Sequence, residues 1–296
     1  MSGEMAVSGV ADGVDWRPLD ERYAAYLDEH PSPAGGSLLA QTILTGPARR
    51  SLLPLVDVPA GSDYLDVGTG FGPMLFEAAH LAPIRGVGLD RDADVLKIAR
   101  MINESLASWL HPGAALGFEF GDVGALPFEA AAFDVCSARL VFQHLPDPTA
   151  AVAELVRVLR PGGRLHVFDV DDGMSITYPA PSSALAALEA AFAVCQSGRG
   201  GDREVGRKLT TYFSDAGLEI TRIHLLPGAE HQRSTPGDAS RTVNSARLMS
   251  ARPEIIARGL MTGEEFDARI EEYRDEPSIG RFRAETQVLV VATKPA

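Results

Sequence analysis

Cysteines and long apolar runs are scarce in this sequence of 296 residues. The only two cysteines, Cys136 and Cys195, form no cluster with metal-ligand spacing. This argues against a disulfide scaffold and a structural zinc site. No apolar run approaches the length that crosses a bilayer, and the first twenty residues lack the basic start and apolar core of a signal peptide. We therefore expect a cytoplasmic protein without a bound metal and without membrane association.

Basic residues are also fewer than acidic residues. The chain has 27 Lys and Arg against 40 Asp and Glu, a formal net charge of −13. Such a surface repels phosphate backbones, which argues against a nucleic-acid partner. Hydrophobic residues make up 45% and charged residues 23% of the chain, values near those of globular proteins, so wholesale disorder is excluded.

From residue 60 onward, short apolar segments alternate with helical patterns. We predict helices at residues 73–81, 92–110, 148–159, 182–195 and 203–216. The predicted strands are residues 62–67, 84–89, 117–120, 133–138, 164–170, 218–226 and 285–293. Alternation of this kind implies parallel pairing. We therefore expect an α/β fold, a doubly wound, Rossmann-like sheet of seven mostly parallel strands.

The regions outside this alternation have helical patterns, which predict helices added to the α/β core. We divide the chain into an N-terminal helical cap segment (1–58), an α/β core (59–226), a helical cap insertion (227–283) and the last core strand (284–296). Asp147 is a predicted N-cap, and Thr262 with Glu265 has the spacing of a capping box. The insertion is too long for a hairpin turn, so we expect it to close, with the N-terminal segment, over the carboxyl edge of the sheet.

The most informative segment runs from Tyr64 to Gly72, with the sequence YLDVGTGFG. An apolar strand ends there in a loop with three glycines, and a helix follows. Glycines let the backbone turn sharply and approach a ligand closely. Pro73 prevents the spacing typical of dinucleotide-binding loops. Asp66, just before the glycines, suits a cationic group and disfavours a pyrophosphate.

Two further acidic residues follow neighbouring strands. Asp90 ends the second predicted strand, where a carboxylate can accept both hydroxyls of a ribose. Asp122 follows the third strand and suits the exocyclic amine of an adenine, with Val123 packed on the ring. Together these features indicate a ligand that combines a nucleoside with a positive charge and has no phosphate.

This series resembles the class I S-adenosylmethionine-dependent methyltransferases. The resemblance covers about residues 60–170. It rests on the glycine loop, GVGLD (86–90), GDVGALPF (121–128), FDVCSARLVFQHLPDP (133–148) and ELVRVLRPGGRL (154–165). The last two are similar to the ubiquinone/menaquinone-methyltransferase-like branch, which acts on small molecules.

The resemblance implies cofactor contacts, which we assign by position. The methionine part would lie against Asp66, Gly68, Thr69, Gly70, Arg139 and Gln143. The ribose would be held by Asp90, and the adenine would lie beside Arg91, Asp122 and Val123.

Residues for catalysis and substrate binding are less clearly indicated. His144 is a candidate general base, although the segment His-Leu-Pro-Asp-Pro is often part of the family pattern irrespective of substrate, which favours a packing role at the edge of a helix or in the core. Tyr178, Arg203, His231 and Arg241 are candidate substrate contacts, with ordinary surface positions or, for Arg203, a helix start as the alternative. We interpret Asp169, Asp171 and Asp172, at the end of the fifth strand, as solvated loop acids rather than as a metal site.

The resemblance implies methyl transfer to an oxygen or nitrogen of a small molecule, plausibly in natural-product biosynthesis. Two alternatives remain open at this point. An S-adenosylmethionine-dependent cyclase or alkyl transferase would share the same core motifs and release methylthioadenosine. A non-catalytic cofactor-binding protein would share them as well. We expect a monomer or a homodimer with a small-molecule substrate.

Overall fold

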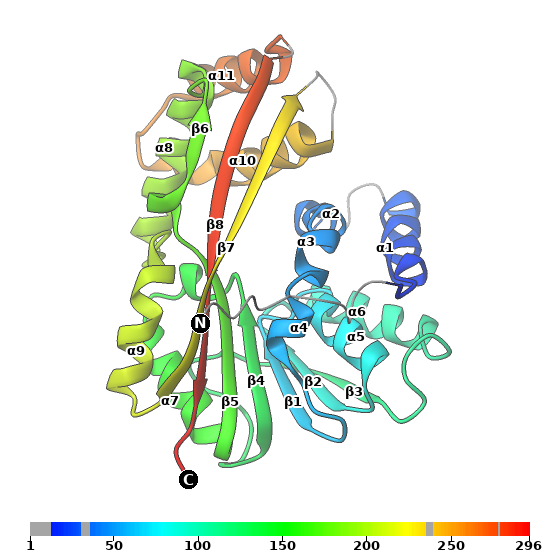
Figure 1. Cartoon of the computed structure of the whole chain (residues 1–296). Coiled ribbons are helices and arrows are strands. Elements are labelled where there is room, and N and C mark those ends of the chain that lie inside the picture. Colours follow the sequence, from blue (N-terminus) through cyan, green and yellow to red (C-terminus); the bar gives the residue numbers. More distant parts are fainter. Residues whose placement is uncertain (1–12, 31–35, 235–238, 278) are drawn as a thin grey trace, which may run out of the picture.

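One sheet of eight strands organises the protein (Figure 1). The computed structural model describes residues 13–30, 36–234, 239–277 and 279–296. The sheet order is β3-β2-β1-β4-β5-β8-β6, and β7 pairs with β8. The strands are β1 (Asp63–Val67), β2 (Arg85–Asp90), β3 (Ala115–Phe120), β4 (Phe133–Arg139), β5 (Leu159–Val170), β6 (Ile176–Tyr178), β7 (Glu219–Ser234) and β8 (Ile279–Thr293).

Strands β1 to β5 are parallel to one another, as the alternating pattern predicts. β8 runs antiparallel to β5, β6 and β7. All seven predicted strands are present, and the three-residue β6 adds an eighth. Because the chain order reverses between β1 and β4, the carboxyl ends of these two strands form the crevice where open α/β sheets bind ligands.

Helices cover both faces of the sheet. α5 (Pro73–Leu81) and α6 (Ala93–Ser105) pack on one face, together with the N-terminal helices. α7 (Pro148–Val158) and α9 (Leu209–Asp215) pack on the other. Asp147 caps α7 by accepting a hydrogen bond from the N–H of Ala150 at 3.0 Å, which confirms the predicted N-cap.

Four helices precede the sheet: α1 (Arg17–Glu29), α2 (Gly36–Leu44), α3 (Gly46–Arg50) and α4 (Leu53–Val56). Buried ion pairs fasten them to α5. Nε of Arg49 donates to Glu77 at 2.8 Å, and Nε of Arg50 donates to the same carboxylate at 2.8 Å. The guanidinium of Arg50 also pairs with Asp20 on α1. One buried carboxylate thus connects α3 to the core, and Arg50 extends this connection to α1 through Asp20.

A second helical layer stands beyond the carboxyl edge of the sheet (Figure 1). It contains α8 (Ser183–Gly198), α10 (Ala239–Ala257) and α11 (Gly263–Asp275). Their shared apolar cluster includes Leu188, Leu248 and Phe266 and is separate from the clusters around the sheet. α11 begins with the predicted capping box, in which Thr262 and Glu265 bond each other's backbone N–H groups. α2 contacts α10, so the two helical additions meet.

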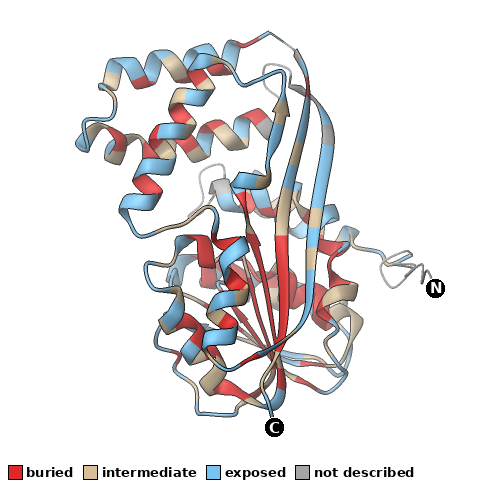
Figure 2. Ribbon diagram, turned by 60° about the vertical axis from the view of Figure 1, so that its left-hand side comes forward, coloured by how far each residue is buried: buried red, intermediate tan, exposed pale blue. Residues whose placement is uncertain are grey.

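Strands β7 and β8 connect the two layers. The lower part of β8 is buried, from Val288 to Ala292, whereas the described residues of the edge strand β7 are exposed or half-buried, and the upper part of β8 is largely exposed (Figure 2). β7 continues past the predicted end at residue 226, and β8 begins before the predicted start at residue 285. The insertion at 227–283 is therefore helical in its middle and extended at both ends, because the two strands continue to pair with each other.

Two further boundaries differ from those expected. α6 ends at Ser105 rather than at residue 110, because Trp109 turns back and stacks on His80 of α5 with ring centroids 4.0 Å apart. The predicted helix at 203–216 starts later, as a short 3-10 turn (Val205–Lys208) followed by α9. Predictions for residues 1–12, 31–35, 235–238 and 278 lie outside the described residues. Within the described part, no helix has both the length and the apolar character needed to cross a membrane.

Candidate active site

The glycine loop connects β1 to α5 at the carboxyl edge of the sheet. Gly68, Gly70 and Gly72 all have positive φ angles, of 64°, 56° and 79°. At Gly68 a side chain would also collide with Val141, which follows β4. The backbone therefore makes this turn only with glycine. The turn brings the loop against the segment after β4, so two of the predicted cofactor regions adjoin.

Asp66 lies buried at the start of this loop. Its carboxylate accepts hydrogen bonds from the hydroxyls of Thr69, at 2.8 Å, and Ser137, at 2.6 Å. The hydroxyl of Tyr64 is 2.6 Å from that of Ser137 and supports it in turn. Burial raises the pKa of Asp66 to about 6, although both hydroxyl bonds oppose this shift. The carboxylate is thus held in one orientation, and a cationic group nearby would stabilise its ionised form.

Asp90 joins the end of β2 to the glycine loop. One carboxylate oxygen accepts the N–H of Gly70 at 2.8 Å, and the other accepts the N–H of Asp92 at 3.0 Å. Each oxygen retains a second lone pair. This leaves the carboxylate half-buried and able to accept two further hydrogen bonds, as the predicted ribose contact requires.

The residues assigned to the adenine occupy different environments. Arg91 and Asp122 are exposed, and Asp122 accepts the N–H of Gly124 at 2.7 Å. Val123 is buried and belongs to the main apolar cluster. These residues follow β2 and β3, which are neighbours in the sheet, so they lie at the same edge.

Arg139 ends β4 beside the glycine loop. Its Nε is buried, and no described residue provides it with a hydrogen-bond partner. Burial lowers the pKa of Arg139 to about 10, and the charge of Arg49 adds to this effect, while Asp169 and Asp66 partly oppose it. Arg139 as a whole is half-buried. A buried Nε–H without a bonded partner is costly, and a ligand carboxylate would satisfy it.

Gln143 lies buried in the turn after β4 and links several elements. Its N–H donates to Asp169 at 3.2 Å, and its side-chain oxygen accepts from Arg203 at 2.9 Å. Its carbonyl accepts the side chain of Gln196 from α8 at 3.0 Å. The guanidinium of Arg203 is also paired with Asp172. Arg203 therefore orders the loops above β4 and β5, and its predicted contact with substrate stays a prediction.

His144 follows Gln143 and is exposed. Surrounding protein reduces the solvation of its imidazole, and Arg203, Arg91 and Arg199 add positive charge. These effects lower the pKa of His144 to about 4. The ring is therefore neutral at pH 7 but is a weak base.

Three residues lie in one register row of the sheet, above the core. Tyr178 on β6 and His231 on β7 both pair in register with Phe282 on β8. Tyr178 is 76% and Phe282 46% exposed. The predicted substrate residues Tyr178 and His231 thus flank an aromatic residue that the sequence did not single out. The sequence offered little signal for it, because Phe282 stands between two arginines in a region read as helical.

The interpretation of the acids after β5 as solvated is wrong for two of the three. Asp169 and Asp171 are fully buried, whereas Asp172 is exposed. Burial raises the pKa of Asp169 to about 7, and Asp171 forms an ion pair with Arg207. Among the described residues, these acids form no metal-binding cluster.

Arg241, weighed as a substrate contact, is also buried. Its guanidinium donates to the carbonyls of Arg274 and Glu276 at the end of α11, at 2.9 and 2.8 Å. It joins α10 to α11 within the upper layer. Such a role has no sequence signature, because its acceptors are backbone carbonyls more than thirty positions away.

Comparison with known proteins agrees with this geometry. Residues 65–167 match a methyltransferase domain. The match identifies this part of the chain as a methyltransferase domain. The matched region contains the glycine loop, Asp90, Asp122, Arg139 and His144, so the residues assigned to the cofactor lie within it.

Three similar proteins show the extent of the likeness. Nocamycin O-methyltransferase of Saccharothrix syringae is 36% identical over 46% of this chain and 45% of its own length. The 27-O-demethylrifamycin SV methyltransferase of Amycolatopsis mediterranei is 27% identical over 82% of this chain and 81% of its own. A Bacillus halodurans protein of known crystal structure is 20% identical over 84% of this chain and 99% of its own, with a TM-score of 0.55. That last likeness shows the fold alone. The chain spans about half the length of several curated relatives that it matches.

Proposed function

We propose that this protein transfers the methyl group of S-adenosylmethionine to an oxygen or nitrogen atom of a small molecule in natural-product biosynthesis. The observation that carries this proposal is the arrangement of Asp66, Asp90 and Arg139 around the glycine loop. Asp66 offers a carboxylate to an amine, and Asp90 offers one to the hydroxyls of a ribose. Arg139 offers a cation with an unbonded Nε to a carboxylate. These are the polar groups of this cofactor. The relatives named for antibiotic substrates support the choice of pathway.

The roles of the side chains follow from their chemistry. The cofactor supplies an activated methyl group on a sulfonium, so the protein's task is to bind, orient and exclude water. Asp66 would bind the amine of the methionine part, and Arg139 would bind its carboxylate. Asp90 would bind the ribose, with Arg91, Asp122 and Val123 around the adenine. Thr69, Gly68 and Gly70 shape the loop against the ligand.

The methyl acceptor would lie between the glycine loop and the upper helical layer. Gln143 and His144 lie between the glycine loop and α8. Neutral at pH 7, His144 would accept a proton only from an acceptor that loses it readily. We assign the space between the layers to the substrate, with Tyr178, Arg203 and His231 as its contacts. Residues 1–58 and 227–283 would be the cap over it.

The partners and location belong to the same proposal. The net charge of −13 disfavours nucleic acid, and both cysteines are free and buried, as suits a reducing cytoplasm. We propose a monomer or homodimer acting on a small molecule.

Product analysis tests the reaction. The protein is incubated with S-adenosylmethionine and candidate acceptors, and the nucleosides are measured by mass spectrometry. S-adenosylhomocysteine formed in step with a methylated acceptor is the expected result. Methylthioadenosine formed above its spontaneous rate would overturn methyl transfer in favour of cyclisation or another alkyl transfer. Tight cofactor binding without turnover over a broad acceptor panel would support a non-catalytic role.

A binding experiment tests the role of Arg139 separately. We expect Arg139→Gln to weaken S-adenosylhomocysteine binding by about tenfold or more, since it removes a charged hydrogen-bond donor. Its affinity for methylthioadenosine, which lacks the amino-acid carboxylate, should not change. Calorimetry with both ligands measures this, with Arg22→Gln on the exposed face of α1 as the matched control. Equal losses for both ligands would contradict the assignment.

A further inference from the structure

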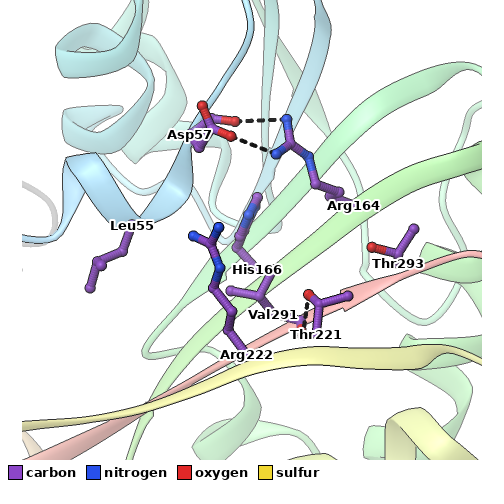
Figure 3. A pocket seen from close by; sticks show the side chains of 8 residues that line it. All are labelled: Leu55, Asp57, Arg164, His166, Thr221, Arg222, Val291 and Thr293. Atoms are coloured by element: carbon purple, nitrogen blue, oxygen red, sulfur yellow. Dashed lines mark hydrogen bonds and ion pairs between the residues drawn. The ribbon is translucent and has the colours of Figure 1, made fainter. Parts of the chain in front are cut away.

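A cavity of about 200 Å³ lies away from the cofactor edge, toward the amino end of β5 (Figure 3). It lies between the end of α4 and strands β5, β7 and β8. Its lining residues are Leu55, Asp57, Arg164, His166, Thr221, Arg222, Val291 and Thr293. None of these residues takes part in the proposed methyl transfer. Pockets for drug-sized ligands are larger, about 300–1,000 Å³, so this cavity suits a small metabolite.

The sheet register places the polar wall of the cavity in one row. His166 on β5 and Arg222 on β7 both pair with Val291 on the strand between them. Side chains of such a row stand on the same face of the sheet. Figure 3 shows the imidazole of His166 and the guanidinium of Arg222 on the side of the sheet toward Leu55 and Asp57.

His166 is the buried polar group of the cavity. It is 1% exposed, and its Nδ1 has no hydrogen-bond partner among the described residues. Burial lowers the pKa of His166 to about 3, and the charges of Arg164 and Arg222 contribute to the shift. The imidazole is therefore neutral and can carry its proton on Nδ1. An unbonded polar atom at this depth is costly unless a ligand satisfies it.

The charges define the kind of ligand. Arg164 is paired with Asp57. Its guanidinium donates hydrogen bonds to the carboxylate of Asp57 at 2.7 Å and to its carbonyl at 3.0 Å. Arg222 has no ion pair or hydrogen bond from its side chain to any described residue. With a neutral imidazole, two arginines and one aspartate leave one positive charge, in a protein of net charge −13. A single anionic charge balances it, while Asp57 repels a dianion. Leu55 and Val291 add apolar surface.

We propose that this cavity binds a small organic monocarboxylate. Its carboxylate accepts hydrogen bonds from the guanidinium of Arg222 and from Nδ1–H of His166, and its short apolar body packs against Leu55 and Val291. Such a ligand connects Asp57, at the end of the N-terminal helices, to the first residues of β7. The site is independent of the proposed methyl transfer.

Isobutyrate is the probe, measured by calorimetry and by the ring signals of His166 in NMR spectra. We expect saturable binding that persists when S-adenosylhomocysteine is present in excess. Isobutyramide, which lacks the charge, should not bind. Arg222→Gln should weaken isobutyrate binding by about tenfold or more, because it removes a charged donor. Arg22→Gln, an equal charge change on the exposed face of α1, should leave it unchanged.

Four results would overturn the proposal. The first is a failure of isobutyrate to bind saturably. The second is equal weakening by Arg222→Gln and Arg22→Gln, which would indicate diffuse attraction. The third is displacement by S-adenosylhomocysteine together with loss of binding in Arg139→Gln, which would place the probe at the cofactor edge. The fourth is tighter binding of inorganic phosphate than of isobutyrate. Arg222 is exposed, so its variant is expected to fold.

Discussion

Asp90 shows how one side chain serves both the fold and the proposed cofactor site. Its carboxylate receives the N–H of Gly70 and so fixes the glycine loop against β2. The same carboxylate has lone pairs left for two hydroxyls. A substitution here removes ligand contacts and loosens the loop that surrounds the ligand.

We therefore expect Asp90→Ala to weaken S-adenosylmethionine binding by roughly 5- to 150-fold, the equivalent of about two hydrogen bonds at 0.5–1.5 kcal/mol each. Titration calorimetry measures the change. Asp94→Ala is the matched control, because Asp94 is an exposed acid of α6 that pairs with Lys97. Unchanged affinity of Asp90→Ala would remove Asp90 from the cofactor site.

His166 makes stability depend on pH. Its folded pKa of about 3 lies below the ordinary value of 6.5. As pH falls from 6.5 toward 3, the unfolded chain binds a proton that the folded chain does not, so the free energy of unfolding decreases. The full contribution is present above pH 6.5 and amounts to at most about 5 kcal/mol.

His166→Phe removes this contribution. We expect the variant to lose less stability than the natural protein between pH 7 and pH 4, whatever its stability at pH 8. Urea denaturation in buffers free of carboxylates measures the difference. Parallel pH profiles for the two proteins would show that the imidazole titrates normally in the folded state.

At the scale of elements, a charge cluster attaches the N-terminal helices to the core. Glu77 is completely buried and receives hydrogen bonds from Arg49 and Arg50. α5, which carries Glu77, starts directly after the glycine loop. The cluster therefore anchors the proposed N-terminal cap beside the site.

Neutralising the shared carboxylate leaves Arg49 buried without a counter-charge, while Arg50 keeps only Asp20. We expect Glu77→Gln to lower the free energy of unfolding by about 3–5 kcal/mol. Chemical denaturation provides the measurement. Glu271→Gln, at an exposed position of α11, should change it by less than about 0.5 kcal/mol. Similar small changes in both variants would show that the cluster contributes little.

At the scale of the whole molecule, the protein has two layers with separate apolar clusters. The upper cluster of α8, α10 and α11 shares no residue with the clusters around the sheet. The layers are connected mainly by β7 and β8, whose middle parts are exposed. Such an arrangement allows the upper layer to open locally while the core stays folded.

Phe266→Ala tests this independence. Truncating a buried phenylalanine costs about 3–5 kcal/mol, and here the loss should be confined to the upper layer. Hydrogen exchange should accelerate in α8, α10 and α11 but not in β1, β2 and β4. S-adenosylhomocysteine affinity should change by less than about threefold, since the assigned cofactor contacts lie at residues 66–143. Faster exchange throughout the core would instead show that both layers unfold together.

The sequence by itself determined the core strands, their parallel pairing, the glycine loop and the helix caps. These depend on local patterns: apolar periodicity, positive φ at glycine and capping side chains within a few positions of their acceptors. The likeness to methyltransferases also followed from motifs in this part of the chain.

Only the tertiary structure decided which charges are buried, how far β7 and β8 extend and where the carboxylate cavity lies. Asp171 is buried because Arg207 folds onto it, and Glu77 because Arg49 and Arg50 do. β7 continues to Ser234 because β8 pairs with it over the same length. His166 and Arg222 share a row only through the strand between them. Each of these features depends on partners far away in the chain, which local patterns do not specify.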